Sequence, residues 1–369
     1  MKIAQVAPLF ESVPPKLYGG TERVVSYLTE ELVRQGHDVT LFASRDSVTK
    51  ARLAPQCPRA LRLDPQCIDQ FAHHVLLLEN VLKHASEFDI IHFHIDYLHF
   101  PWSRRYNLTH LTTLHGRLDI PDLVPLYREF KEMPVVSISN AQRKPLRWLN
   151  WQATIYHGLP PDLCTLHPAP GHYLAFLGRI SPEKGVDQAI EIAKRAGLKL
   201  VIAAKVDPAD RAYFEQIIRP LLAHPLIEYI GEIGETEKDE FLGHALALLL
   251  PLDWPEPFGL VMIEAMAAGT PVIAFRCGSV PEILEDGVTG YIVSDADEAV
   301  AALERVPSLN RAKCREAFDR RFTAARMSRD YLKVYELLQA GGSTQVATTQ
   351  AAGVASKLAA APRLAGTLS

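Results

Sequence analysis

The sequence predicts an α/β fold of two Rossmann-like domains, each with a doubly wound parallel sheet, that face one another across a cleft. Three observations support this prediction. The chain has 369 residues, which is more than one ordinary core needs. Short apolar strands alternate with amphipathic helices, a pattern typical of parallel pairing. This alternation occurs twice, before and after the proline-rich stretch at residues 159–170.

The first round of alternation predicts an N-terminal domain over residues 1–165. KIAQVAP is expected to form a buried strand, and TERVVSYLTEELVRQ a helix with Thr21 as a candidate cap and Gly36 beyond its end. Four more strands are expected in HDVTLFAS, FDIIHFH, HLTTLHG and PVVSISN. The domain is therefore expected to contain a parallel sheet with helices on its faces.

The second round predicts a C-terminal domain over residues 166–318. Its expected strands are HYLAFLGRI, KLVIAAK, IEYIGEI, ALALLLP, TPVIAFR and GYIVSD, with helices that include VDQAIEIAKRAG and DADEAVAALERV. Residues 319–340 are expected to form a final amphipathic helix that packs back on the N-terminal domain. Residues 341–369 are rich in Ala, Thr, Ser and Gly and lack aromatic residues, so we expect a disordered tail.

Composition narrows the class of protein. The net charge of -4 gives no reason to expect a nucleic-acid surface. The five cysteines are scattered without metal-ligand spacing, which indicates reduced thiols. The N-terminus does not resemble a signal peptide, and ALALLLPL is too short to span a bilayer. These features favour a cytoplasmic enzyme.

Glycines and charged residues gather after the predicted strands, where ligands of open parallel sheets bind. In LYGGTERVV, Gly19 and Gly20 allow backbone to approach an anion, although a plain turn is the alternative. In FLGRISPEKG, Gly178, Arg179 and Lys184 surround a helix start. Two cations at a helix N-terminus suit a pyrophosphate. A solvated basic turn is the alternative there.

Two carboxylates lie within the apolar segment PEPFGLVMIEAMAAGTP. Pro257 and Gly259 exclude a helix through Glu256, so the helix is expected to begin near Leu260. Glu256 then lies in a loop and Glu264 one turn into the helix, where the two can address different parts of one ligand. An unpaired Glu264 among apolar residues would be costly. It is expected to accept hydrogen bonds from hydroxyls such as a ribose diol, or alternatively to pair with a buried backbone group or an arginine.

Taken in order, Gly19-Gly20, GRISPEKG, EPFGLVMIEAMAAGTPVIA and GSVPEILEDGVTG resemble the motifs of the family-four retaining glycosyltransferases of the GT-B fold, which use nucleotide-diphosphate sugars. The resemblance covers about residues 1–338. LYGGTERVV and AAKVDPADRAYF look typical of the avilamycin-type glycosyltransferase branch. The chain departs from the family at Lys205, where many members carry glycine, and at Ser279, where a second glycine is commoner.

The resemblance implies a role for each motif residue. Arg179 and Lys184 would hold the diphosphate and stabilise it as it leaves, Glu256 would bind the transferred sugar and Glu264 the ribose. His115 matches a strand-end histidine near that sugar. Further contacts with the sugar donor are implied for Gly19, Gly20, Gly178, Lys205, Glu232, Ile233, Phe258, Gly259 and Leu260. The implied reaction moves a hexosyl unit, with UDP as the leading nucleotide and with no cofactor or metal. The acceptor would be a small molecule, a glycan or a lipid-linked molecule.

Three other segments contain residues that could contact a metal, an acceptor or a membrane. Asp295–Asp297 resembles an Asp-x-Asp metal motif but is expected to cap a helix. His92, His94 and His99 lack a further ligand at a convincing spacing for zinc. They are expected in the core or the cleft, with His94 and Asp96 as secondary candidates for acceptor contacts. The basic and aromatic residues at 143–151 favour a solvated linker helix over a membrane or acceptor contact.

Two other functions remain as alternatives to glycosyl transfer. One is a sugar-nucleotide epimerase of the same fold, which would need acid and base carboxylates around the sugar. The other is a catalytically silent protein that binds a sugar nucleotide. The spacing of Glu256 and Glu264 favours transfer over the first. The presence of Arg179, Lys184 and His115 together with both glutamates favours transfer over the second.

Overall fold

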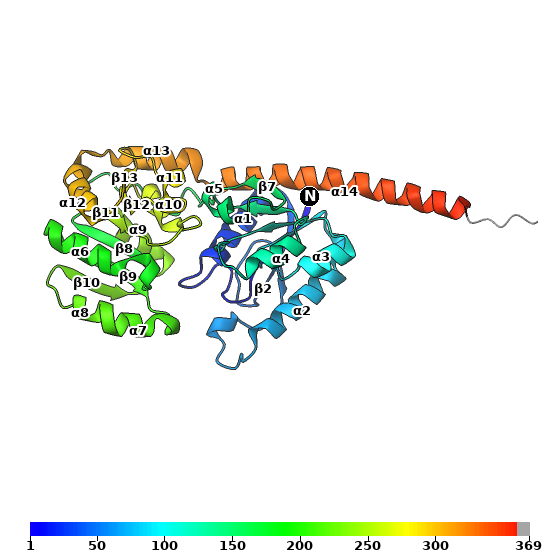
Figure 1. Cartoon of the computed structure of the whole chain (residues 1–369), viewed down its shortest axis with the longest axis horizontal. Helices are drawn as coiled ribbons and strands as arrows, with labels where there is room; N and C mark the ends of the chain where they lie inside the picture. The colour runs from blue at the N-terminus through cyan, green and yellow to red at the C-terminus, as the bar shows by residue number, and fades with distance from the viewer. Residues whose placement is uncertain (360–369) are drawn as a thin grey trace, which may run out of the picture.

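Two domains lie side by side in this computed structural model (Figure 1). The structure describes the backbone of residues 1–359 and the side chains of residues 1–341. The N-terminal domain holds a seven-stranded sheet of order β3-β2-β1-β4-β5-β6-β7, and the C-terminal domain a six-stranded sheet of order β10-β9-β8-β11-β12-β13. The paired strands run parallel, for example β1 with β2 and β8 with β9. The predicted α/β architecture of two parallel-sheet domains is confirmed.

The N-terminal sheet contains two strands that the sequence pattern did not predict. These are β3 and β7, the edge strands, and neither contains a fully buried residue. Short, half-exposed edge strands carry little apolar signal, which explains why the pattern did not reveal them. The strands of this sheet are β1 (Lys2–Val6), β2 (Asp38–Ala43), β3 (Arg52–Pro55), β4 (Ile90–Phe93), β5 (His110–Thr113), β6 (Val135–Ser137) and β7 (Trp151–Thr154).

Helices cover the N-terminal sheet. They are α1 (Gly20–Arg34), α2 (Gln70–Lys83), α3 (Phe100–Tyr106), α4 (Leu123–Glu129) and α5 (Asn140–Arg143). Helix α1 begins at Gly20, and its N-cap position is Gly19, so Thr21 lies inside the helix and is not the cap. The expected linker helix at 143–151 is also absent. The chain there makes a short 3₁₀ turn around Pro145 and enters β7, because proline cannot continue the preceding helix.

The C-terminal sheet has the strands that the pattern predicted. They are β8 (Tyr173–Arg179), β9 (Leu200–Lys205), β10 (Ile227–Gly231), β11 (Ala245–Leu250), β12 (Val272–Phe275) and β13 (Gly290–Val293). The helices are α6 (Val186–Ala196), α7 (Arg211–Tyr213), α8 (Arg219–Leu221), α9 (Glu235–Gly243), α10 (Leu260–Ala267), α11 (Val280–Ile283), α12 (Ala296–Arg305) and α13 (Arg311–Arg321). Asp295 caps α12, since its carboxylate accepts from the Glu298 amide at 2.9 Å. The capping interpretation is confirmed for Asp295, while Asp297 lies in the first turn of the helix and pairs with Arg195.

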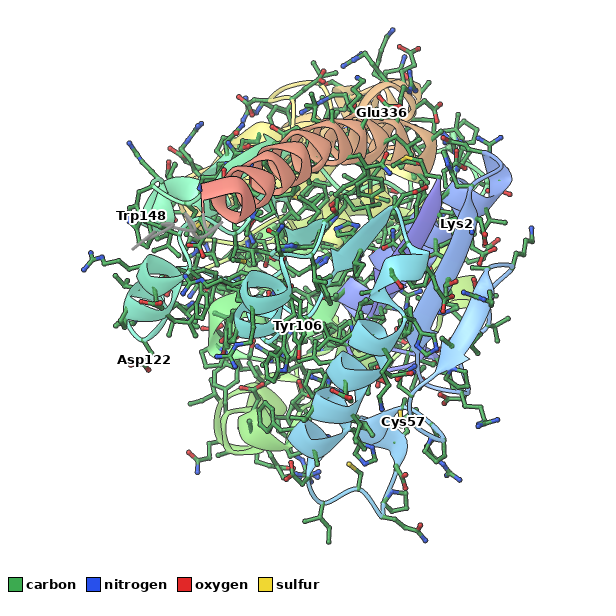
Figure 2. The ribbon with its side chains drawn as sticks, turned by 90° about the vertical axis from the view of Figure 1, so that its right-hand side faces the viewer. Lys2, Cys57, Tyr106, Asp122, Trp148 and Glu336 are labelled. Atoms are coloured by element: carbon green, nitrogen blue, oxygen red, sulfur yellow. The ribbon has the colours of Figure 1, made fainter. Side chains whose placement is uncertain are left out.

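The last helix, α14 (Ala324–Ala359), returns to the N-terminal domain and packs against α1. Figures 1 and 2 show it running along that domain, with Glu336 on the helix and Lys2 on the strand below it. Helix α13 still packs on α10, so the chain leaves the C-terminal domain at about Phe322, slightly later than the expected residue 318. Of the expected disordered tail at 341–369, the side chains of 342–359 and all of 360–369 lie outside the described residues. The backbone up to Ala359 continues α14.

Candidate active site

A cavity of about 610 Å³ lies between the two domains, beyond the C-terminal ends of strands from both sheets. It is lined by every residue that the sequence analysis assigned to the site: Gly19, Gly20, His94, Asp96, His115, Gly178, Arg179, Lys184, Lys205, Glu232, Ile233, Glu256, Phe258, Gly259, Leu260 and Glu264. Residues from distant parts of the chain therefore meet at one place, as the strand-end rule predicts.

The two cations expected to hold a diphosphate follow β8. Arg179 ends the strand and lies 3.6 Å from carboxylate oxygens of both Asp207 and Asp210. Lys184 pairs with the carboxylate of Glu256, and its ammonium lies 4.9 Å from the centre of the Trp254 ring. Both cations are thus balanced by carboxylates within the protein. An anionic ligand can replace these carboxylates as the partner of either cation.

The loop that carries Glu256 is held by the segment after β12. Gly278 has φ +53, and a Cβ there would lie 2.4 Å from backbone atoms of Glu256, so only glycine fits. The Ser279 amide donates to the Glu256 carbonyl at 3.0 Å, and its hydroxyl donates to the Phe258 carbonyl at 2.8 Å. Ser279, a departure from the family pattern, therefore bonds directly to the loop. Trp254 Nε1 also donates to the Glu256 carboxylate, at 3.1 Å.

Glu264 lies inside α10 with its carboxylate almost fully buried, and its partner is a lysine. Lys238 of α9 donates to it at 2.9 Å, rather than the arginine or backbone group considered from the sequence. Lys238 also lies 3.8 Å from Glu235, which pairs with Arg23 of α1 in the other domain. The ribose-binding candidate thus belongs to a charge network that crosses the cleft.

A loop of the N-terminal domain also reaches across the cleft, just before Gly19. The Tyr18 amide donates to the Glu232 carboxylate at 2.9 Å. Lys205 pairs with Asp207 at 3.0 Å, and its ammonium lies 5.6 Å from the centre of the Tyr18 ring. Lys205 therefore faces the cavity as a paired cation.

His115 follows β5 on the opposite wall and is neutral. Burial lowers its pKa to about 3. Its Nε2 lies 2.9 Å from Nδ1 of His94, whose own Nε2 lies 2.8 Å from the Gln5 side-chain oxygen. Because that oxygen only accepts, His94 carries its proton on Nε2 and its Nδ1 accepts from His115. Nδ1 of His115 is then left as a hydrogen-bond acceptor. Both ring nitrogens of His94 form hydrogen bonds within the protein, so we infer that His94 holds His115 in position.

The hydrogen-bond chain continues into α14. Gln5 donates to the Tyr335 hydroxyl at 3.2 Å, and that hydroxyl lies 2.7 Å from Nδ1 of His92. His92 bonds Thr113 at 2.8 Å, and Thr113 bonds the Tyr331 hydroxyl at 2.8 Å. These imidazoles are therefore bonded to protein groups, as expected for core histidines. In the part of the chain that the structure describes, no three His, Cys, Asp or Glu residues are grouped to hold a metal.

Two carboxyl groups on the N-terminal wall have raised pKa values. Loss of hydration raises the pKa of Asp96 to about 6, although the His115 amide donates a hydrogen bond to it. Asp96 also adopts φ +50, which is uncommon outside glycine. Burial raises the pKa of Glu22 in α1 to about 7, against hydrogen bonds from backbone amides. Both residues line the cavity, so this wall carries weakly acidic rather than fully ionised groups.

Sequence reasoning missed several residues of this site. Lys238 lies on α9 among four acidic residues, a pattern typical of a solvated charged face, which gives no reason to single it out. Gln5 and Tyr335 are 330 positions apart, so their contact leaves no local pattern. His157, whose ring stacks on His115 with a centroid distance of 5.4 Å, lies in a loop without strand or helix periodicity.

The basic and aromatic segment at 143–151 lies outside the cavity. Arg143 donates to the Ser137 hydroxyl at 2.7 Å and stacks on Trp151, while Arg128 lies over the Trp148 ring. Figure 2 shows Trp148 at the edge of the N-terminal domain. Within the described residues, no helix is both long enough and apolar enough to cross a membrane.

Two protein-family models match the chain. Glycosyltransferase Family 4 matches residues 18–159, and Glycosyl transferases group 1 matches residues 165–321. Together the two matches cover both walls of the cavity. The chain belongs to the glycosyltransferases of this GT-B group.

Curated glycosyltransferases resemble the chain to different extents. A D-inositol 3-phosphate glycosyltransferase of Mycobacterium marinum is 34% identical over 147 residues, which are 36% of this chain and 29% of that protein. An uncharacterized glycosyltransferase of Methanocaldococcus jannaschii is 25% identical over 364 residues, which are 84% of this chain and 89% of that protein. The alignments with the first two curated relatives span less than half of their lengths.

Solved structures share the fold over nearly the whole chain. AviGT4, a glycosyltransferase involved in avilamycin A biosynthesis, is 25% identical with a TM-score of 0.68, and the alignment covers 92% of this chain and 98% of that chain. HepE of Anabaena in complex with UDP-glucose is 20% identical with a TM-score of 0.66, covering 92% of this chain and 100% of that chain.

Proposed function

We propose that this glycosyltransferase moves a hexosyl unit from a nucleotide-diphosphate sugar, UDP-sugar in the first place, to a hydroxyl of an acceptor. In this proposal the anomeric configuration is retained and no metal is required. The observation that carries the proposal is that Arg179, Lys184 and the first residues of α10 line one cavity between two parallel sheets. The UDP-glucose complex of HepE supports the choice of nucleotide.

The main chemical task is to stabilise the diphosphate as its bond to the sugar breaks. Negative charge builds on the phosphate oxygens, and preorganised cations and amide dipoles stabilise such charge most effectively. Arg179 and Lys184 would supply the cations. The first amides of α10, which follow Gly259 at φ +77, would supply the dipoles. This combination would take the place of the metal ion that other transferases use.

The remaining groups would orient the substrate. Glu256 would accept hydrogen bonds from hydroxyls of the transferred sugar, and Glu264, held by Lys238, from the ribose. Nδ1 of neutral His115 would accept a hydrogen bond from another hydroxyl of the sugar. The acceptor hydroxyl would attack the anomeric carbon from the face that the diphosphate leaves. A phosphate oxygen would take its proton, so that the C–O bond formed replaces the C–O bond broken.

A thermal-shift screen with UDP-, GDP- and ADP-sugars, in buffer with EDTA, tests this function. A ligand that binds only the folded protein stabilises it by about 2.7 kcal/mol at a hundred times its dissociation constant. We expect UDP-sugars to raise the melting temperature most, with the same rise when Mg²⁺ replaces EDTA. A rise that requires Mg²⁺ would refute metal independence. No rise with any nucleotide would refute the function itself.

A further inference from the structure

The first two turns of α2 carry apolar side chains on both faces, beside the polar Gln70, His73 and His74. The inner face buries His74, Leu77 and Leu78. On the outer face, Phe71 is 67% exposed, Val75 54% and Leu76 62%, and Ile68 just before the helix is 99% exposed. The outer face of a surface helix is normally polar, so several exposed apolar side chains on it call for an explanation. We call Ile68, Phe71, Val75 and Leu76 the α2 ridge.

The ridge is continuous with the cavity between the domains. Phe71 lines that cavity together with Phe10 and Arg62. The Arg62 guanidinium lies 5.3 Å from the Phe10 ring centre and 3.5 Å from the Glu11 carboxylate, so its charge is compensated. The path from the cavity to the ridge is therefore walled by aromatic rings. Figures 1 and 2 show α2 at the outer surface of the N-terminal domain.

Charge on α2 indicates what the ridge binds. Residues 70–78 contain no lysine, arginine, aspartate or glutamate, and Asp69 uses its carboxylate to cap the amides of Phe71 and Ala72. Of the two histidines on this stretch, His74 is buried, and the next charged residues, Glu79 and Lys83, pair with each other. An anionic membrane surface would therefore find no unpaired lysine or arginine on this helix. A contiguous exposed apolar patch instead marks a binding site for an apolar group.

We propose that the α2 ridge binds the hydrocarbon chain of an amphiphilic acceptor, whose hydroxyl-bearing head group enters the cavity past Phe71 and Arg62. The identity of the head group as acceptor rests on the proposed function. From Phe71 to Leu76 the helix rises by about 7.5 Å, so the ridge with Ile68 offers an extended contact for an alkyl chain. Each methylene fully removed from water strengthens binding about fourfold.

Calorimetric titration of the full chain tests this proposal. The probes are n-dodecyl β-D-glucoside against methyl β-D-glucoside, and n-dodecyl phosphate against inorganic phosphate, all below the critical micelle concentration. We expect the wild type to bind at least one dodecyl probe about tenfold more tightly than its short partner, or better. The double variant Val75→Ser/Leu76→Ser should lose most of this advantage. Leu337→Ser on α14, which is 71% exposed in the wild type, is the matched control and should keep it.

Several results would overturn the proposal. The first is that the wild type binds the dodecyl and the short probe of each pair with equal affinity. The second is that Leu337→Ser loses as much of the affinity advantage of the dodecyl probe as the double variant does. Binding of the wild type to phosphatidylcholine vesicles without a preference for dodecyl probes would indicate a bilayer surface instead. A dimer in sedimentation that the double variant dissociates would indicate a second copy of the chain.

Nucleotide binding separates the failure of this proposal from the failure of the proposed function. The double variant should keep the thermal shift with UDP, because Val75 and Leu76 do not line the cavity. If the wild type binds UDP but no dodecyl probe, the hydrocarbon-binding role of the α2 ridge is refuted and the proposed function is not. A wild type that binds a dodecyl probe but no nucleotide refutes the proposed function and leaves the ridge standing.

Discussion

The two walls of the cavity use different chemistry. The C-terminal wall carries full charges that are already paired, such as Lys184 with Glu256 and Lys238 with Glu264. The N-terminal wall adds buried imidazoles to its paired arginines, above all His115, whose pKa burial lowers to about 3. The first wall can exchange an internal carboxylate for an anionic ligand. The second keeps its imidazoles neutral near pH 7, beside Asp96 and Glu22, whose pKa values are raised by burial.

This difference follows from the cost of burying charge. An unpaired cation in a closed cleft would be destabilising, so the carboxylates on the C-terminal wall hold Arg179 and Lys184 in position. Neutral imidazoles carry a much smaller desolvation cost, and they lie deeper, under α14. The comparison teaches that charge is placed where a diphosphate would neutralise it, and that neutral groups are placed where an uncharged sugar would bind.

The largest expected effect comes from Glu256→Gln on the charged wall. Transfer should fall by about 10²–10³-fold, the cost of losing one strong transition-state interaction. UDP affinity should stay equal or increase, because Lys184 loses its carboxylate partner. Initial rates and calorimetric UDP titration measure the two quantities.

Glu240→Gln is the control for this prediction, since Glu240 is exposed on α9 and should change neither quantity. If UDP binding weakened as much as transfer, Glu256 would be holding the nucleotide, and the idea of exchangeable pairs on this wall would be wrong.

An intermediate effect is expected from Tyr335→Phe behind the neutral wall. The Gln5 amide and Nδ1 of His92 both lose their hydroxyl partner. Leaving buried polar groups unpaired should lower the free energy of unfolding by about 1–3 kcal/mol, which urea denaturation measures. Tyr106→Phe on the exposed end of α3 should change nothing. Equal stability of the two variants would show that the hydrogen-bond chain does not hold this wall.

The smallest effect concerns the pH dependence of Glu22, whose pKa is raised from 4.5 to about 7 by burial. The unfolded chain releases this proton near pH 4.5 and the folded protein near pH 7. The stability that the group contributes is therefore complete below pH 4.5 and is lost as the pH rises through 7. Glu22→Gln avoids that loss, so its melting temperature relative to wild type should rise by about 2 °C or more between pH 5 and pH 8.

Glu79→Gln, at an exposed position on α2, is measured in parallel as the control. A melting-temperature difference between Glu22→Gln and wild type that is constant with pH would show that burial does not raise the pKa of Glu22.

Local chain chemistry explains why most of the cavity could be predicted. Pro257 and Gly259 end any helix through Glu256, and strand-end loops must meet at the same edge of a parallel sheet. Partnerships across the cleft could not be predicted in the same way. The pairing of Lys238 with Glu264 depends on how α9 packs beside α10, and no spacing in the sequence reports that.

The exposure of the α2 ridge likewise could not be predicted from the sequence pattern. Its residues form an ordinary apolar run in the sequence, and such a run normally predicts a core helix. Only the packing of α2 shows that Phe71, Val75 and Leu76 face outward. The edge strands β3 and β7 escaped prediction for a related reason, because their few residues are half-buried and carry no clear alternation.

The return of α14 has a consequence for the order in which the protein matures. On the ribosome, β1 with Gln5 emerges first, but its partner Tyr335 emerges only after the whole C-terminal domain. Until then, His92 and Gln5 lack the hydroxyl that joins them. The domain that is synthesised first is thus completed last, and His115 gains its full support only when both halves of the enzyme have been made.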